Sequence, residues 1–99
     1  MTGRPTLSPR AREDLDAIWD HTANRWGIDQ AESCTRQIGR HVEAVAAQPI
    51  MGRACSEVRA GYCQYPSGPH VLFYRLMGES ADIVCILHGR MNFERHLPD

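Results

Sequence analysis

The spacing of apolar residues changes once along this 99-residue chain, at Pro49. Before that point, apolar residues recur every three or four positions, which is typical of one face of an α-helix. After it, they fall in short runs rich in β-branched and aromatic residues, and turn residues separate these runs. A segment patterned for a helix does not suit a strand, and the reverse also holds. The sequence therefore predicts an α+β fold with its helices before its main sheet.

The first helix is predicted to begin after Ser8 and to end near Gly27. Serine is a good N-cap, Pro9 suits the first helical position, and glycine is a common residue just past a helix end. A short edge strand is expected just before it, at residues 6–7. One stripe of the helix is apolar and is expected to face the core: Ala11, Leu15, Ile18, Trp19, Thr22 and Trp26. We expect both tryptophans to be mainly buried.

A second helix is predicted to follow almost at once. Asp29 and Glu32 match a capping box loosely, because aspartate replaces the usual serine or threonine. Pro49 ends the helix. Because the connection is so short, the two helices should form an antiparallel hairpin.

Three β-rich runs follow, at residues 62–66, 70–76 and 81–88, and they predict an antiparallel sheet of at least three strands. The last two runs carry apolar residues on both faces, whereas a half-solvated antiparallel sheet should alternate apolar and polar residues. One helical hairpin covers one face only. An exposed apolar strip usually marks a partner site, so we expect another macromolecule to cover the second face. The alternative is a strongly curled sheet that closes over that face itself.

Charge and cysteine content limit the function. The 11 basic residues are all arginine and nearly balance 12 acidic residues, so binding to nucleic acid or membranes through bulk charge is not expected. No lysine is present to act as a base or to form a Schiff base. The four cysteines form no C-x-x-C pair and no histidine pair has metal-binding spacing, so we predict no metal and no cofactor. Cys34 and Cys85 are expected in the core.

Residues 1–99 are expected to form a single domain. The first residues, MTGRPTLS, contain no apolar leader, and the longest apolar run, IVCIL, is too short to span a bilayer. We therefore expect a cytoplasmic protein.

Four fragments in order resemble the ParE toxins of the RelE/ParE toxin–antitoxin superfamily. They are Ser-Pro-x-Ala-x-x-Asp-Leu at residues 8–15, Ile-Trp-Asp at 18–20, Tyr-Pro-x-Gly-x-His-x-x-x-Tyr-Arg at 65–75 and Ile-Leu-His-x-Arg-Met at 86–91. The resemblance covers residues 7–97. It implies a RelE/ParE-like fold, with a short N-terminal strand and an antiparallel helical hairpin packed on an antiparallel β-sheet.

The resemblance also implies a function. ParE toxins are neutralised by a cognate ParD-like antitoxin whose C-terminal segment wraps the toxin, and their commonly assigned target is DNA gyrase. We therefore expect the toxin of a type II toxin–antitoxin module that inhibits gyrase without catalysis. Nothing in the chain resembles a helix-turn-helix, so sequence-specific DNA binding by this chain alone is not expected.

The alternative is a RelE-like ribonuclease that cuts mRNA on the ribosome, because the same fold hosts both activities. RNA cleavage needs an acid, a base and positive charge at the phosphate. The chain has no lysine, and Phe93 occupies the position after the last strand where a catalytic tyrosine is sought. Residues that still offer an acid–base set are His70, His88, Arg59, Arg75 and Tyr74. Structural roles are the simpler interpretation of these side chains, so we predict no catalytic residues.

Two sets of binding residues are predicted. Arginine offers bidentate hydrogen bonds, and methionine and phenylalanine offer adaptable apolar contact, so the segment after the last strand suits protein recognition. The target-binding set is Arg75, His88, Arg90, Met91, Asn92, Phe93, Arg95 and His96. The antitoxin-binding set is Leu72, Tyr74, Val84 and Ile86, together with the edges of the helical hairpin. The sequence leaves open whether Val71, Phe73, Cys85 and Leu87 form the outward face instead.

Overall fold

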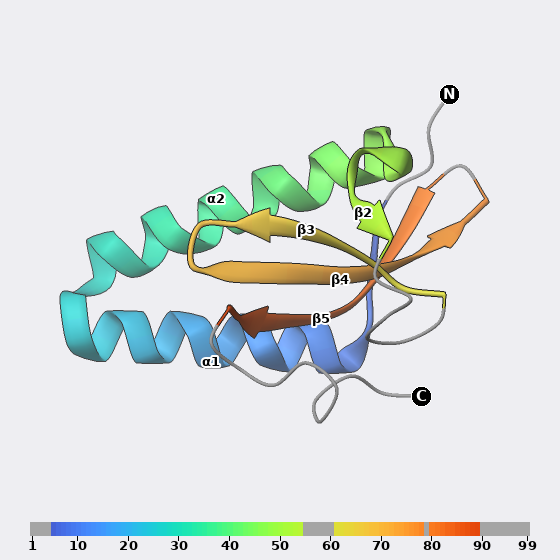
Figure 1. The fold of residues 1–99 in the computed structure, drawn as a ribbon. Helices are drawn as coiled ribbons and strands as arrows, with labels where there is room; N and C mark the ends of the chain where they lie inside the picture. Colours follow the sequence, from blue (N-terminus) through green and yellow to red (C-terminus); the bar gives the residue numbers. More distant parts are fainter. Residues whose placement is uncertain (1–4, 55–60, 79, 90–99) are drawn as a thin grey trace.

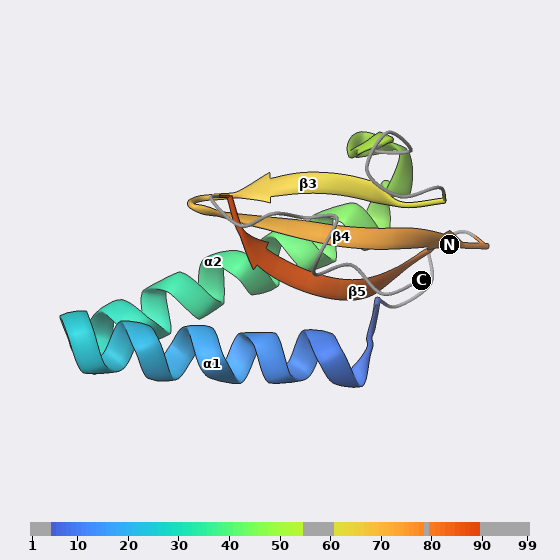
Figure 2. The same cartoon turned by 60° about the horizontal axis from the view of Figure 1, so that its bottom comes forward.

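The structure is a computed structural model that describes residues 5–54, 61–78 and 80–89 of the chain. The elements follow in the order β1 (Thr6–Leu7), α1 (Pro9–Trp26), α2 (Ile28–Ala47), the 3₁₀ helix η1 (Pro49–Met51), β2 (Arg53–Ala54), β3 (Cys63–Ser67), β4 (His70–Met77) and β5 (Ser80–His88). The two helices lie antiparallel on one face of the sheet (Figures 1 and 2). The predicted α+β fold is confirmed.

The helix boundaries agree with the sequence at all but one point. Ser8 caps α1, since its Oγ accepts the Ala11 N–H at 3.0 Å, and Pro9 is the first helical residue. Gly27, with φ of 98°, lies between α1 and α2, a conformation that favours glycine. The predicted capping box at Asp29 is wrong, because α2 begins at Ile28 with no side-chain cap.

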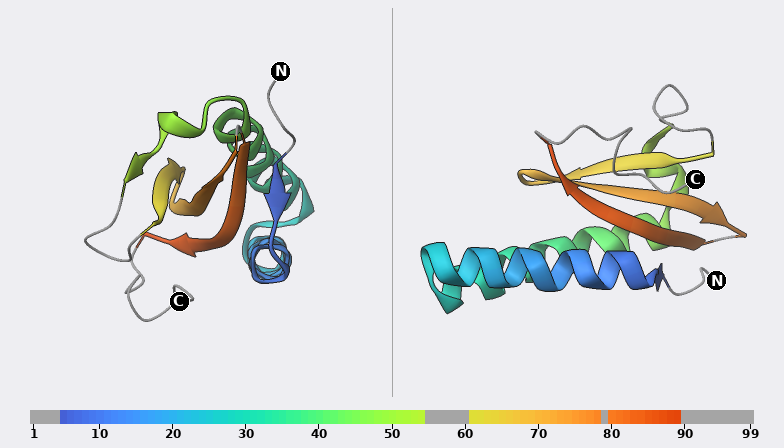
Figure 3. Two further views of the ribbon diagram at one scale, coloured as in Figure 1. Left: turned by 90° about the vertical axis from the view of Figure 1, so that its right-hand side faces the viewer. Right: turned by 90° about the horizontal axis from the view of Figure 1, so that it is seen from below.

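The sheet has five strands in the order β1-β5-β4-β3-β2. The predicted antiparallel strands are β3, β4 and β5, while β1 pairs parallel to β5 and makes the sheet mixed. The pairing of β4 with β5 shifts once. Phe73 pairs with Cys85 but Tyr74 pairs with Ile83, so Val84 is an extra residue in β5. Such a bulge bends its strand and increases its twist, and the end-on view shows a strongly curled sheet (Figure 3).

Both faces of the sheet are buried within the chain. The helix-facing cluster includes Leu72, Tyr74, Ile83 and Ile86 from the sheet, with Ile38, Val42 and Val45 from α2. The outer cluster, on the other face, consists of Tyr62, Phe73, Val84, Cys85 and Leu87, with Val71 packed against it. Phe73 and Cys85 are 0% exposed. The apolar residues of this second face are therefore buried within the chain, and the expectation that they need a partner to cover them is wrong.

This arrangement also corrects the set chosen as an uncovered strip. Leu72, Tyr74 and Ile86 pack under the helices, and only Val84 of that set lies in the outer cluster. The alternating pattern misleads here because the bulge at Val84 lets both Ile83 and Ile86 face the helices. The other set, with Val71, Phe73, Cys85 and Leu87, does lie on the outer face, but apart from Val71 it is almost fully buried.

Among the described residues, the large apolar side chains that remain exposed lie away from the strand centres. They are Trp26, Ile28, Ile50, Met51, Leu76 and Met77. The prediction that Trp26 is buried is wrong, since it is 66% exposed, whereas Trp19 is half-buried. Cys85 is buried as predicted, and Cys34 is only half-buried.

Candidate functional site

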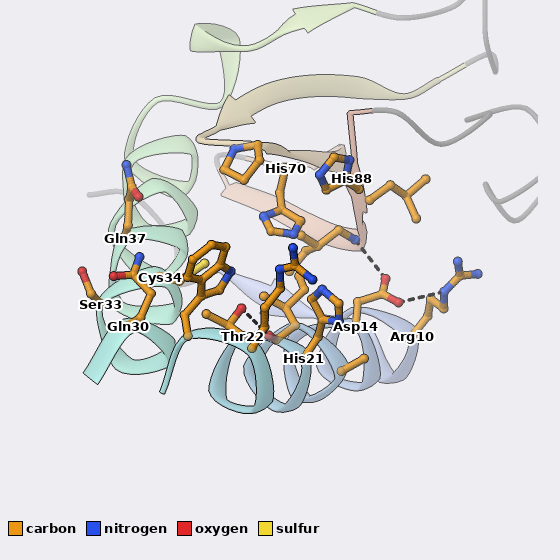
Figure 4. A pocket seen from close by; sticks show the side chains of 17 residues that line it. Arg10, Asp14, His21, Thr22, Gln30, Ser33, Cys34, Gln37, His70 and His88 are labelled. Carbon is orange, nitrogen blue, oxygen red and sulfur yellow. Dashed lines mark hydrogen bonds and ion pairs between the residues drawn. The ribbon is translucent and has the colours of Figure 1, made fainter. Parts of the chain in front are cut away.

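A groove of about 910 Å³ lies between α1, the first half of α2 and the end of the sheet where β4 begins and β5 finishes (Figure 4). Ile18, Ile86 and Leu87 contribute apolar walls. His21 and Arg25 of α1 line the same space. A concave site with mostly apolar walls and a few polar groups is typical of a binding site, so the groove is the candidate functional site.

The groove exists because α1 is attached to the edge of β5 by side chains. β1 covers that edge only at Asp82 and Ile83, and buried backbone groups beyond it need other partners. Ser8 donates its N–H to the Ile83 carbonyl at 2.9 Å and its hydroxyl to the Val84 carbonyl at 2.6 Å. These bonds hold the start of α1 close to the sheet.

Asp14 makes the next attachment along the same edge. Its Oδ2 accepts the Ile86 N–H at 3.0 Å, and its Oδ1 accepts Arg10 Nε at 3.3 Å (Figure 4). The carboxylate therefore has a partner for each oxygen. Toward its C-terminal end, α1 carries His21 and Arg25 on the same face as Asp14. Both side chains line the groove.

Three histidines meet at the groove. His70 and His88 are paired across β4 and β5, and their rings meet edge to face with centroids 5.5 Å apart. Figure 4 shows His70 reaching from the sheet toward α1, which carries His21. Within the described part of the chain, the buried Nδ1 of His70 has no hydrogen-bond partner. Burial lowers the pKa of His70, and the charges of His88 and His21 lower it further. Both effects favour the neutral form of His70.

Of the acid–base set considered for RNA cleavage, His70 and His88 meet at the groove, but Tyr74 and Arg75 do not join them there. Tyr74 faces the helices, where its hydroxyl donates to the Pro49 carbonyl at 2.6 Å and accepts the Gly52 N–H at 3.0 Å. Arg75, the next residue, lies over the ring of Tyr62 and donates Nη2 to its hydroxyl at 2.9 Å. Successive residues of a strand point to opposite faces. Arg59, the remaining basic candidate, lies outside the described residues.

Two of the predicted target-binding residues lie in the described part of the chain, and the other six lie outside it. Arg75 is exposed on β4 and stacks on Tyr62, and His88 lines the groove at the end of β5. The others lie outside the described residues: Arg90, Met91, Asn92, Phe93, Arg95 and His96.

The sequence reasoning missed the groove itself and the side chains that α1 contributes to it. A signal was present, because Asp14, Ile18, His21 and Arg25 follow helical spacing and so share one face of α1. That face also carries part of the apolar stripe of α1, which is the more conspicuous pattern.

Two classes of site are not found in the described part of the chain. No three histidine, cysteine, aspartate or glutamate side chains in residues 5–54, 61–78 and 80–89 are grouped to hold a metal ion. Within the same residues, no helix is both long and apolar enough to cross a membrane.

Known proteins resemble this chain along almost its whole length. One relative, Toxin ParE1 of Mycobacterium tuberculosis, is 47% identical over 98 residues, which are 98% of this chain and 100% of the relative. Toxin ParE1 of Caulobacter vibrioides is 43% identical over 91 residues, covering 92% of this chain and 94% of the relative. A solved structure, described as a chromosomal ParDE toxin–antitoxin system from P. aeruginosa, superimposes with a TM-score of 0.77.

That structure shares only 21% sequence identity, and the match covers 88% of this chain and 96% of the other, so it supports the fold. The family assignment comes from sequence. The sequence model described as "ParE toxin of type II toxin-antitoxin system, parDE" matches residues 6–93. Together with the relatives at 47% and 43% identity, this match shows that the chain belongs to the ParE toxin family of type II toxin–antitoxin systems.

Proposed function

We propose that this toxin arrests growth by binding DNA gyrase without catalysing a reaction, and that a ParD-like antitoxin neutralises it. The family assignment supports the toxin role. The observation that carries the non-catalytic part is the position of Tyr74, whose hydroxyl is held by Pro49 and Gly52 under the helices. A hydroxyl with both its donor and its acceptor function engaged by backbone groups is poorly placed to transfer a proton to RNA.

The antitoxin is proposed to occupy the groove. Since the outer face of the sheet is already covered, the groove is a large concave surface that the described residues leave open at the edges of the helical hairpin. Its walls include Trp26, which is 66% exposed, and the apolar side chains of Ile18 and Ile86. An amphipathic segment that places its apolar residues there would bury this surface.

The target-binding residues stay a proposal. They are Arg75, His88 and the six residues predicted after Gly89, and deletion of the residues after Gly89 tests those six. Loss of growth arrest by a truncated chain that still folds is expected. A folded truncation with undiminished toxicity would contradict the role of this segment.

Two assays run side by side test the proposed target. Purified toxin is expected to inhibit supercoiling by DNA gyrase in a dose-dependent manner, and the co-encoded antitoxin is expected to restore the activity. The same preparation is expected to leave mRNA intact on translating ribosomes. Ribosome-dependent cleavage without gyrase inhibition would reverse the proposal.

A RelE-like ribonuclease is the second candidate. The observation that favours it is the groove, where three histidines and Arg25 lie close together and could supply acid, base and phosphate contact. The groove lacks lysine, and Tyr74 does not line it. The cleavage assay decides between the two functions.

A further inference from the structure

The ionisable side chains that line the groove are mostly basic. Arg10, Arg25 and the histidines His21, His70 and His88 all line it, and Asp14 is the acidic side chain among its described lining residues. Both oxygens of Asp14 are already bonded, to Arg10 and to the Ile86 N–H. Apart from Asp14, the described lining residues carry no carboxylate, and the buried Nδ1 of His70 has no hydrogen-bond partner in the described part of the chain.

The histidines themselves oppose one another when charged. The rings of His70 and His88 are 5.5 Å apart, and His21 is close enough for its charge to act on His70. Like charges at this separation disfavour protonation, and burial of His70 disfavours it further. The remaining titratable group on the facing walls is the Cys34 thiol of α2. An anion placed among the three rings would relieve this repulsion.

Arg25 also favours an anionic occupant of the groove. Its guanidinium lies over the ring of Trp26 at 5.3 Å, and both residues line the groove. The opposite wall, on α2, contributes neutral hydrogen-bonding side chains, Gln30, Ser33 and Gln37. An occupant with apolar residues and a carboxylate on one face would complement the groove, whereas a basic occupant would face like charges.

We propose that His21, His70 and His88 form a subsite for a carboxylate, which an aspartate or glutamate side chain of the bound antitoxin segment fills. The inference rests on the proposed function, because it assumes that the antitoxin occupies the groove. It adds the chemical class of the group bound there and a dependence of the complex on pH.

The pH dependence follows from linkage. A carboxylate near a histidine favours the charged imidazolium and raises its pKa. The complex then binds more protons than the separate chains, and acid strengthens association. Uptake of one proton makes the dissociation constant fall by up to about tenfold per pH unit across the range in which the histidines titrate.

The test measures binding of the toxin to its full-length co-encoded antitoxin by isothermal titration calorimetry between about pH 8 and pH 6. Repeating the titrations in buffers of different ionisation enthalpy gives the number of protons taken up. NMR titration of the histidine rings, in the free toxin and in the complex, then identifies which residue gains the proton. We expect tighter binding at the lower pH and a raised pKa for at least one of His21, His70 and His88.

Variants separate the subsite from general effects of pH. The double variant His21→Gln/His88→Gln removes two of the rings and is expected to abolish most of the proton uptake. His41→Asn is the matched control, because His41 lies on α2 against Ser67, with Nδ1 at 2.6 Å from Oγ, and does not line the groove. The control is expected to keep the pH dependence. Circular dichroism and urea unfolding establish that both variants are folded.

The outcomes distinguish this inference from the proposed function. Binding that is independent of pH, or weaker in acid, overturns the carboxylate subsite but leaves the antitoxin role intact. Histidine resonances that do not change in the complex overturn it as well. An antitoxin that fails to bind at any pH overturns the proposed partner and this inference together.

Discussion

Two polar clusters lie on the helix-facing side of the sheet, and they differ in how completely their groups are paired. At one, the Tyr74 hydroxyl donates to Pro49 and accepts from Gly52, and the tyrosine is 0% exposed. At the other, the groove, His70 has a buried Nδ1 without a partner in the described part of the chain, beside about 910 Å³ of open space.

The difference separates a structural role from a binding role. A buried polar network with every group satisfied rigidifies a core, and the Tyr74 cluster ties the end of α2 to the sheet in this way. An unsatisfied polar group beside a cavity is costly in the free protein and gains when a ligand supplies the missing partner. Substitutions at the Tyr74 cluster should therefore reduce stability, and substitutions of the groove histidines should mainly alter binding.

The largest effect is expected from Gly52→Ala. A Cβ atom on Gly52 would lie 2.0 Å from the Tyr74 hydroxyl and 2.9 Å from the Gln64 carbonyl, so the tyrosine would have to move and lose its hydrogen bonds. We expect a loss of about 3 kcal/mol of unfolding free energy, measured by urea denaturation. Gly39→Ala is the control. Gly39 lies in α2 with nothing near its Cβ position. The Gly39→Ala substitution should therefore stabilise the folded chain by up to about 1 kcal/mol. Equal effects would contradict the close packing at Gly52.

Asp14→Ala, at the attachment of α1 to β5, is expected to cause a smaller loss of unfolding free energy. The change leaves the Ile86 N–H without its acceptor, which costs about 2 kcal/mol. Asp14→Asn keeps an acceptor and should lose less. Asp16→Ala, at an exposed position two residues along α1, should change the unfolding free energy by less than about 0.5 kcal/mol. The comparison by urea denaturation fails if Asp14→Ala behaves like Asp16→Ala.

Tyr74→Phe is expected to lower the stability of the toxin without changing its toxicity. Loss of the hydroxyl leaves the Gly52 N–H and the Pro49 carbonyl without this partner and is expected to cost about 1.5 kcal/mol. Growth arrest at a temperature where the variant stays folded should be unchanged, because the hydroxyl is proposed to have no catalytic role. Tyr65→Phe is the control, since it preserves the ring contact with His41. Loss of toxicity by a folded Tyr74→Phe variant would support the ribonuclease alternative.

The smallest effect concerns pH. Because burial and the neighbouring histidines lower the pKa of His70 in the folded chain, the unfolded chain binds more protons between the folded and unfolded pKa values. Stability should therefore be greatest above the pKa of an unfolded histidine and fall as the pH decreases through that window. The slope from one group is at most about 1.4 kcal/mol per pH unit. His70→Gln should flatten it, and His41→Asn should not. Thermal unfolding at several pH values measures both.

Much of the fold follows from local sequence signals. Ser8 and Pro9 mark the start of α1, Gly27 separates the helices, and Pro49 follows α2 within two residues. These signals act through the conformation of one or a few neighbouring residues. They are therefore visible without knowledge of the rest of the chain.

The sheet faces were harder to predict because they depend on pairing. The bulge at Val84 moves Ile83 and Ile86 onto one face, which no alternating pattern predicts. Burial of Phe73 and Cys85 depends on how the curled sheet packs on its outer side. Trp26 fits the apolar stripe of α1 but lies beyond the sheet contacts, beside Arg25, at the end of the helix.

The groove shows most clearly what local sequence patterns cannot predict. His70 and His88 could be named as candidates from sequence because their side chains offer acid–base chemistry. Their proximity to His21, however, requires α1 to lie along β5. That placement depends on bonds such as Asp14 to Ile86, which joins residues 72 positions apart. No local pattern encodes a contact over such a separation.

The amino-acid sequence alone specified the kinds of element, their order, the helix ends and the family, since each is carried by neighbouring residues or by short motifs in register. Only the folded chain decided which sheet face the helices cover, that the other face is buried without a partner, and where the groove opens. The physical reason is that pairing register and packing bring together side chains that are distant in sequence, and burial and charge acquire their effects only there.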